Sequence, residues 1–315
     1  MHGTGRPDPI VVVRARSDDD LNAMIQVRAA ADPHSPRPRL DNLRHNLAGN
    51  PDLAYLVART RDAPVGCGFV DVSQAAVARA HVLVAPSARR QGVGTALLAG
   101  ASDYARMGAQ TELEGPIRAD DEASLQFFER RGFAKSGGEE AVVLDLAEIG
   151  DWTAEPPAGV RIVSRAEAPD TVEGMYQVAC EAEPDIPGGA PVRPYEVWRA
   201  TEIERPSLEP ELTFVALAGD EVVGYAILDS LRGEPWHRLT AVKRAWRGRG
   251  IATALKRAQI QEAKKRGFGR LVTTNEERNR PMQSINRTLG YRPEPSLSTI
   301  VVRGPLLPAE ADAGL

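Results

Sequence analysis

The stretch KRAWRGRGIATALK, residues 243–256, decides the fold because it places a glycine-rich turn directly before a helix. Gly248 and Gly250 can take positive φ angles and let a ligand approach the backbone. The helix start offers N–H groups that have no partner within the helix, and the positive end of the helix dipole. Three arginines in the turn place positive charge beside this positive end, which destabilises the helix unless the arginines bind an anion. The stretch therefore predicts a seat for a phosphate or pyrophosphate; a helix start with solvated arginines is the alternative.

A second copy of this turn, RRQGVG, lies at residues 89–94. Gly92 and Gly250 are separated by 158 residues, and so are Gly132 and Gly290. Neither copy has the Gly-Lys-Ser/Thr of a P-loop or the GxGxxG of a dinucleotide fingerprint. A repeat of about half the chain length indicates a duplicated domain and not a solenoid.

The two halves are expected to be separated by a short linker rich in glycine and proline. We predict an N-terminal domain over residues 1–149, a linker over 150–159, a C-terminal domain over 160–305 and a tail over 306–315.

Each half shows the same order of apolar runs. A first strand precedes two helical stretches, then two strands joined by a tight turn, then a third strand that leads into the glycine turn. The corresponding ranges are 10–15 and 160–165 for the first strand, 80–84 and 238–242 for the third, and 93–107 and 251–266 for the long helix. A last strand pair is expected to complete each half. This mixture predicts an α+β fold with a mixed α/β sheet.

The bulk composition sets limits on the class of protein. The chain has 42% hydrophobic and 26% charged residues and a net charge of −4, which disfavours nucleic acid as a partner. Its two cysteines, Cys67 and Cys180, supply neither a disulfide framework nor a metal cluster. The apolar run Ile10–Val13 is too short for a signal peptide or a membrane span. We expect a soluble cytoplasmic protein with no membrane partner, present as a monomer or homodimer.

Several segments together resemble the GNAT superfamily of acyltransferases. Both copies of the turn fit an Arg-x-x-Gly-x-Gly/Ala loop after a strand that ends in Val. The segments Asn279–Tyr291 and Ser124–Phe133 resemble the last helix of that family and its closing Gly-aromatic pair. The resemblance covers most of both halves. It implies two tandem GNAT-like domains, each with a central, mostly antiparallel, splayed sheet flanked by helices.

The resemblance also implies acetyl-CoA as the cofactor. In the family, the strand before the loop binds the pantetheine arm, and the loop and helix start bind the pyrophosphate. The residues that this assigns in the C-terminal half are Ala241, Val242, Arg247, Gly248, Arg249, Gly250, Ala252, Thr253 and Asn279. Those assigned in the N-terminal half are Leu83, Val84, Arg89, Arg90, Gln91, Gly92, Gly94 and Thr95.

The implied chemistry is direct attack of an amine on the thioester, which requires a base and allows an acid. We predict Glu234 and His237 as candidate bases, although an ordinary core histidine is an equal alternative for His237. The tyrosine acid of many family members is missing, because Phe128 and Asn286 stand at the matching positions. Three acidic residues are predicted to receive a cationic amine, unless they form only a solvated loop: Glu181, Glu183 and Asp185.

The predicted function is therefore acetyl-CoA-dependent N-acetylation of a primary amine on a small molecule, in the C-terminal half. The N-terminal half is expected to be a degenerate copy, because Asp121 replaces the asparagine found at Asn279. Two alternatives stay open. One is a non-catalytic protein that binds or senses acyl-CoA, and the other is a peptide or protein N-acetyltransferase.

Overall fold

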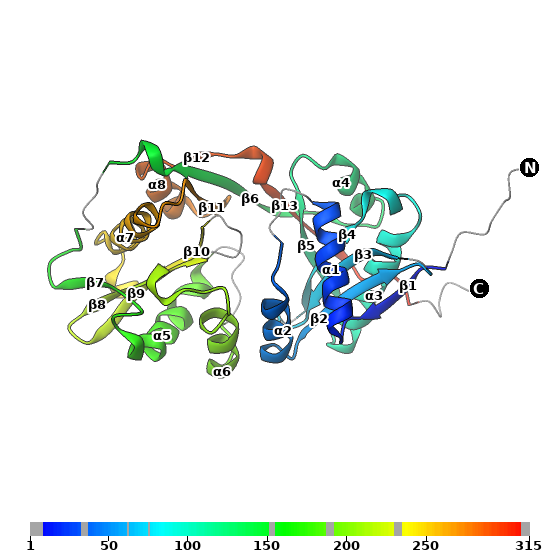
Figure 1. The fold of residues 1–315 in the computed structure, drawn as a ribbon, viewed down its shortest axis with the longest axis horizontal. Coiled ribbons are helices and arrows are strands. Elements are labelled where there is room, and N and C mark those ends of the chain that lie inside the picture. The colour runs from blue at the N-terminus through cyan, green and yellow to red at the C-terminus, as the bar shows by residue number, and fades with distance from the viewer. Residues whose placement is uncertain are drawn as a thin grey trace, which may run out of the picture. The chain divides into compact units, whose positions relative to one another are not determined.

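The computed structural model describes residues 9–32, 37–61, 63–74, 76–150, 155–186, 192–229 and 235–309, and its ribbon is shown in Figure 1. The chain divides into two compact units. Unit 1 contains residues 1–116, 123–134 and 302–315, and unit 2 contains residues 117–122 and 135–301. None of the helices in the described residues is long and apolar enough to cross a membrane.

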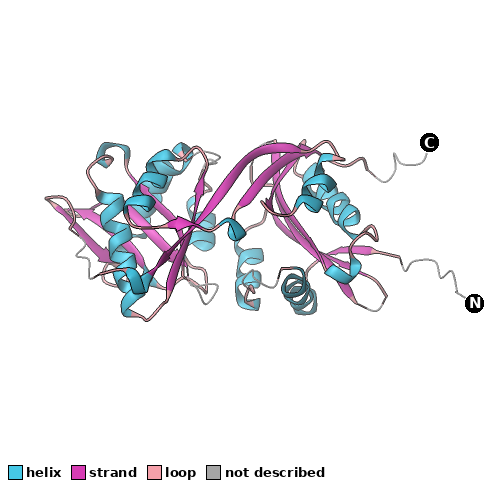
Figure 2. Ribbon diagram, turned by 90° about the horizontal axis from the view of Figure 1, so that it is seen from above, coloured by secondary structure: helices cyan, strands magenta, loops and turns pink. Residues whose placement is uncertain are grey.

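Unit 1 is an α+β unit around strands in the order β1-β2-β3-β4-β5. Its elements are β1 (Val11–Arg14), α1 (Asp18–Ala31), α2 (Leu40–Gly49), β2 (Leu53–Arg59), β3 (Pro64–Asp71), β4 (Val77–Val84), α3 (Val93–Met107), β5 (Glu112–Arg118) and α4 (Glu122–Glu129). Consecutive residues of β3 face different helices. Gly66 lies against Val93 and Leu97 of α3, whereas Cys67 contacts Met24 of α1. Since side chains alternate along a strand, α1 and α3 cover opposite faces of the sheet (Figure 2).

Unit 2 repeats this plan in the strand order β11-β10-β9-β8-β7, with β6 added beside β11. Its elements are β6 (Ala134–Asp145), β7 (Val160–Ser164), α5 (Val172–Ala182), α6 (Tyr195–Trp198) with a π-helical turn (Arg199–Ile203), β8 (Thr213–Ala218), β9 (Glu221–Asp229), β10 (Trp236–Val242), α7 (Ile251–Lys265), β11 (Arg270–Glu276), α8 (Arg280–Thr288) and β12 (Arg292–Pro293). The last strand, β13 (Thr299–Pro305), begins in unit 2 and continues into unit 1 at residue 302. The predicted fold class and the long helices after both glycine turns are confirmed.

A parallel strand pair in each unit separates soon after it forms. In unit 1, β4 pairs with β5 only from Val77 to Arg79, and in unit 2 β10 pairs with β11 only at Trp236 and Val272. Gly115 is required at the first of these points, because a Cβ there would lie 2.0 Å from the Ala80 carbonyl oxygen. The rest of β4 and β10 therefore presents a backbone edge that β5 and β11 do not cover.

The last strands do not follow the predicted domain boundaries. We expected residues 1–149 to form one domain and 160–305 the other, each completed by its own strand pair. Instead β6 pairs antiparallel with β11 in unit 2, from Asp145 opposite Arg270 to Glu139 opposite Glu276. In return, residues 302–309 belong to unit 1, where Arg303 Nε lies 3.0 Å from Glu112 Oε2.

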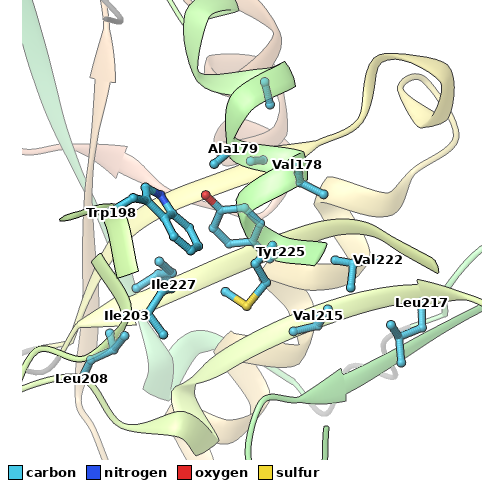
Figure 3. Packing of buried hydrophobic residues seen from close by; sticks show 13 residues of the cluster. Val178, Ala179, Trp198, Ile203, Leu208, Val215, Leu217, Val222, Tyr225 and Ile227 are labelled. Carbon is cyan, nitrogen blue, oxygen red and sulfur yellow. The ribbon is translucent and has the colours of Figure 1, made fainter. Parts of the chain in front are cut away.

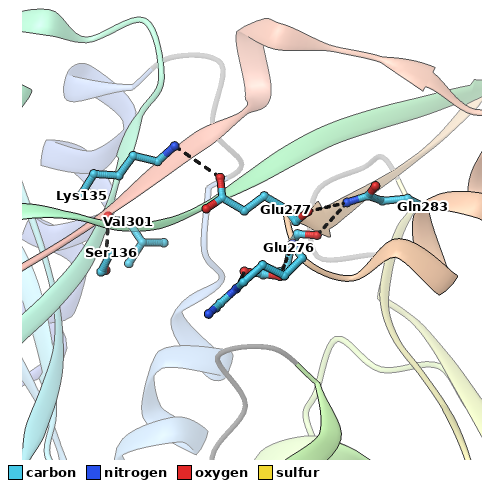
Figure 4. Close-up of polar contacts among 7 residues, drawn as sticks. Lys135, Ser136, Glu276, Glu277, Gln283 and Val301 are labelled. Carbon is cyan, nitrogen blue, oxygen red and sulfur yellow. Dashed lines mark hydrogen bonds and ion pairs between the residues drawn. The ribbon is translucent and has the colours of Figure 1, made fainter.

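Polar contacts hold the start of β6 within unit 2 (Figure 4). Lys135 forms an ion pair with Glu277 at 3.3 Å, and Ser136 Oγ donates to the Val301 carbonyl at 3.4 Å. Residues 135–145 of β6 thus complete the sheet of unit 2, and residues 302–305 of β13 complete the sheet of unit 1. Periodicity identifies such strands but does not say which sheet edge they join.

The largest aromatic side chains of unit 2 gather in the core between α5, α6 and the sheet (Figure 3). Trp198 is 2% exposed and Tyr225 is fully buried. Their ring centroids lie 6.5 Å apart with nearly perpendicular planes, an arrangement that aromatic pairs prefer. This core fixes α5 and α6 above β9 and β10.

Candidate active site

The glycine turn of unit 2 forms an open cradle at the N-terminus of α7. Gly248 and Gly250 have φ angles of 71° and 86°, which favour glycine. A Cβ at either position would meet no heavy atom of the described residues within 4 Å. Gly250 is the N-cap of α7 and has no side chain to bind the first N–H groups of the helix. These amides are therefore available to an anion.

The end of β10 leads into this cradle. Ala241 and Val242 pair with Tyr225 and Gly224 of β9, and their other edge lies beyond the point where β11 separates. Arg247 Nε donates to the Val242 carbonyl at 3.1 Å, which joins the strand end to the loop. A bare strand edge next to an anion seat fits the pantetheine arm and pyrophosphate of coenzyme A.

Two of the loop arginines contact an acidic turn at the end of α5. Asp185, on a 3₁₀ turn over Glu183–Asp185, accepts from Arg244 Nε at 2.7 Å and from Arg247 Nη1 at 2.8 Å. These two cations hold the pKa of Asp185 well below its usual range. Glu181 accepts from the Arg244 backbone N–H. Glu181 and Asp185 thus face the predicted phosphate seat and not a separate acceptor pocket.

Glu183, between these two acids, points toward the aromatic core. Its Oε1 accepts from the Tyr225 hydroxyl at 3.2 Å. Burial and the nearby Glu202 carboxylate raise the pKa of Glu183, and Tyr225, Trp198 and Arg238 oppose this shift only in part. The buried Trp198 side chain thus lies beside this carboxylate, together with the Tyr225 hydroxyl.

A second carboxylate on the same face is already neutralised. Glu202, on the π-helical turn, accepts from Arg238 Nε at 3.0 Å, and both side chains are partly exposed. Arg238 follows the point where β10 and β11 separate, at a break in the β9–β10 register. Glu183 has no ion pair among the described residues, so it is the carboxylate of this face without a cation.

His237 lies on the opposite face of β10 and is buried there. It is 3% exposed, and its Nδ1 lies 2.9 Å from Gln259 Oε1 on α7. Burial and the Lys256 charge lower its pKa well below the ordinary value. A side chain enclosed between α7 and the sheet fits the alternative of an ordinary core histidine, and a role of His237 as base stays a prediction. The other predicted base, Glu234, lies outside the described residues.

A buried lysine accompanies His237. Lys256 is 1% exposed, and its Nζ lies 5.4 Å from the centroid of the Tyr291 ring. Burial lowers the pKa of Lys256 to about 7. No sequence signal singles out this lysine, because it adjoins the apolar positions of a helix whose other lysines lie at its C-terminal end.

The predicted cofactor residue Asn279 serves the structure of α8. Its Oδ1 accepts from the Met282 N–H at 3.3 Å, as an N-cap does. Gln283 donates from Nε2 to the carbonyls of Glu276 and Glu277 at 3.1 and 3.0 Å, which fixes the turn before the helix (Figure 4). Contact of Asn279 with a cofactor stays a prediction.

The loop of unit 1 keeps the shape of the cradle but is less open. Gly92 has a φ of 90°, and Arg90 takes a left-handed φ of 64° where unit 2 has Gly248. Arg131 Nη2 donates to Thr95 Oγ1 at 2.8 Å, and its guanidinium lies 3.7 Å from the centroid of the Phe127 ring. A Cβ on Gly94 would lie 3.5 Å from that ring. Thr95, a predicted phosphate ligand, already has a partner.

Sequence reasoning missed Tyr225, Glu202 and Arg238. Arg238 carried no usable signal, because the irregularity between His237 and Leu239 interrupts the alternation of side chains along β10. Glu202 lies in a stretch without clear periodicity, and nothing in the sequence places it beside β10.

Comparison with known proteins agrees with this arrangement. Residues 51–135 match the acetyltransferase (GNAT) domain, and residues 173–291 match the acetyltransferase (GNAT) family. A mycothiol acetyltransferase from Catenulispora acidiphila is 26% identical over 310 residues, which cover 90% of this chain and 95% of that protein. An N-alpha-acetyltransferase 30 from Schizosaccharomyces pombe is 34% identical over 89 residues, 26% of this chain and 58% of that protein.

Solved structures share the fold over the whole chain. A tandem GNAT protein from the clavulanic acid biosynthesis pathway has a TM-score of 0.74 at 21% identity, covering 96% of this chain and 100% of its own. A GCN5-related N-acetyltransferase from Sphaerobacter thermophilus has a TM-score of 0.72 at 21% identity, covering 96% and 97%.

Proposed function

Because this chain belongs to the GNAT acetyltransferases and carries two of their domains in tandem, we propose that unit 2 transfers an acetyl group from acetyl-CoA to the primary amine of a small molecule. The observation that carries the proposal is the open glycine cradle beside the bare edge of β10. Acetyl-CoA, when bound, supplies an activated acetyl thioester.

The residues of unit 2 fit the parts of this cofactor. The first amides of α7, with Thr253, suit the pyrophosphate, and Arg244, Arg247 and Arg249 suit its negative charge. The backbone at Ala241 and Val242 suits the amides of the pantetheine arm. A backbone N–H on this edge would also stabilise negative charge on the thioester carbonyl oxygen.

Unit 2 is the better candidate for the working site because of three differences from unit 1. Its loop has Gly248 where unit 1 strains Arg90 into a left-handed conformation. No described residue lies within 4 Å of a Cβ on Gly250, whereas the Ile10 side chain lies 3.7 Å from a Cβ on the equivalent Gly92. It also presents Glu183, which forms no ion pair among the described residues, on the face above β10.

Calorimetric titration of acetyl-CoA tests the cofactor site. We expect Gly250→Glu to weaken binding at least 100-fold, about 2.7 kcal/mol, because the carboxylate occupies the phosphate seat. Gly219→Glu is the matched control, since Gly219 also has a positive φ and an open Cβ position but lies in the β8–β9 turn. Gly92→Glu should leave this site unchanged.

A second measurement follows thiol release from acetyl-CoA with a panel of small amines. Unimpaired binding without thiol release would favour a protein that binds or senses acyl-CoA and would refute the proposed transfer. Loss of binding in Gly92→Glu but not in Gly250→Glu would place the working site in unit 1 and refute the assignment to unit 2.

A further inference from the structure

A row of four aromatic rings in unit 2 ends at the Glu183 carboxylate. Tyr195 and Tyr176 have ring centroids 5.2 Å apart, Tyr176 and Trp198 are 5.3 Å apart, and Trp198 and Tyr225 are 6.5 Å apart. Tyr195 and Tyr176 are partly exposed, whereas Trp198 and Tyr225 are buried. The row therefore runs from the surface to the partly buried carboxylate, with Trp198 and Tyr225 side by side in Figure 3.

This row lies on the face of the sheet where the thioester would be presented. Tyr225 is the cross-strand neighbour of Ala241, and both belong to one core cluster together with Leu239. Side chains of such neighbours have Cβ atoms about 5 Å apart. Glu183, bonded to the Tyr225 hydroxyl, is thus one strand away from the bare edge of β10.

The groups around Glu183 offset its burial only in part. The Tyr225 hydroxyl, the Trp198 N–H and the nearby Arg238 lower the pKa of Glu183, whereas burial and Glu202 raise it, and burial is the largest effect. Glu183 forms no ion pair in the described ranges, because Arg238 is bound to Glu202. A partly buried carboxylate without an ion pair is costly, so an entering ammonium would be stabilised by the charge and by the faces of the rings.

Extending the proposed function of unit 2, we propose that Glu183 is the catalytic base, and that the acceptor is a primary amine on an apolar aryl or alkyl stem. The stem lies along Tyr195 and Tyr176, and the ammonium binds Glu183. One N–H proton passes to the carboxylate, and the freed nitrogen lone pair forms the bond to the acetyl carbon. The C–S bond breaks, and the departing sulfur takes the second proton, so that amine and thioester become amide and thiol.

The raised pKa of Glu183 agrees with this role, since a base works best when its pKa approaches the working pH. Asp185 and Glu181 face the loop arginines, and Glu202 faces Arg238, so these carboxylates are held by other partners. Tyr225, whose pKa is raised by burial and by the two glutamates, stays protonated and donates to the base.

The test compares Glu183→Gln with Glu173→Gln, an exposed glutamate in the first turn of α5. Thiol release is followed with 2-phenylethylamine and n-butylamine as apolar amines and with glucosamine as a polar one. We expect Glu183→Gln to lower kcat/KM for the apolar amines at least 100-fold, with acetyl-CoA binding unchanged by calorimetry. In the unaltered protein, kcat/KM should fall as the pH falls through the raised pKa of Glu183, and this fall should disappear in the variant.

Each other outcome has a distinct meaning. If Glu183→Gln keeps the kcat/KM and pH profile of the unaltered protein, Glu183 is not the base. If glucosamine is preferred over both apolar amines, the inferred acceptor class is wrong while the proposed transfer stands. If acetyl-CoA binds but no amine releases thiol, the proposed transfer fails, and the role of Glu183 fails with it.

Discussion

Replacing Lys256 by methionine should stabilise unit 2, and the gain should depend on pH. The lysine is 1% exposed, and burial lowers its pKa from the ordinary 10.5 to about 7. Between these pH values the unfolded chain holds a proton on Lys256 that the folded protein has lost. The free energy of unfolding therefore rises with pH across this window.

The magnitude follows from the same two pKa values. One pH unit within the window changes the contribution of a single group by about 1.4 kcal/mol. The lysine therefore costs up to about 5 kcal/mol at pH 7 and below, and this cost disappears as the pH approaches 10.5. Methionine fills a similar volume without a charge, so Lys256→Met should remove most of this cost.

Urea unfolding followed by tryptophan fluorescence measures this effect in unit 2 alone. All four tryptophans of the chain lie within residues 135–301, the main segment of this unit. The stability difference between Lys256→Met and the unaltered protein should be largest near pH 6.5 and shrink by about 2 kcal/mol or more by pH 9. Lys265→Met is the control, because its side chain on the same helix is 80% exposed.

A stability difference that stays constant between pH 6.5 and 9 would refute this reasoning. It would mean that the Lys256 amine keeps its charge in the folded protein. A difference equal to that of Lys265→Met would show that burial of the amine has no energetic cost.

The acidic turn and the strained loop give two further predictions. Asp185→Asn should tighten acetyl-CoA binding several-fold, because Asp185 competes with the phosphates for Arg244 and Arg247. A titration followed by Trp246 fluorescence measures this, with Glu221→Gln as the control. Weaker binding would mean that Asp185 instead positions the arginines. Arg90→Gly should stabilise unit 1 by up to about 1 kcal/mol, because it relieves a left-handed φ of 64°. Slower hydrogen exchange in β4 and α3 would support this, and unchanged exchange would contradict it.

The local elements of this fold follow directly from the sequence, because each depends on a short pattern. The helix after the first glycine turn begins at Val93 and ends at Met107 as predicted, and the second ends at Lys265, one residue early. Both glycine turns have the positive φ angles expected of them. A turn of a few residues carries its own conformational requirement, so its sequence is sufficient to identify it.

The candidate site was less predictable because it depends on contacts between distant segments. Glu183 was identified from its charge alone, whereas its partner Tyr225 lies 42 residues further along. His237 and Arg238 are adjacent, and only the face of the sheet decides which one reaches the acceptor side. The three acids of one turn were predicted to share a role, but their side chains divide between the phosphate seat and the aromatic core.

The exchanged strands make the two units depend on different parts of the sequence. Unit 2 is formed mainly by the continuous segment 135–301. Unit 1 is made first but needs the last segment: a Cβ on Gly304 would lie 2.5 Å from Phe133, and the Leu307 N–H donates to the buried Ser102. A chain that lacks residues 302–309 would therefore leave an edge of the unit 1 sheet without its partner strand, and unpaired strand edges promote aggregation.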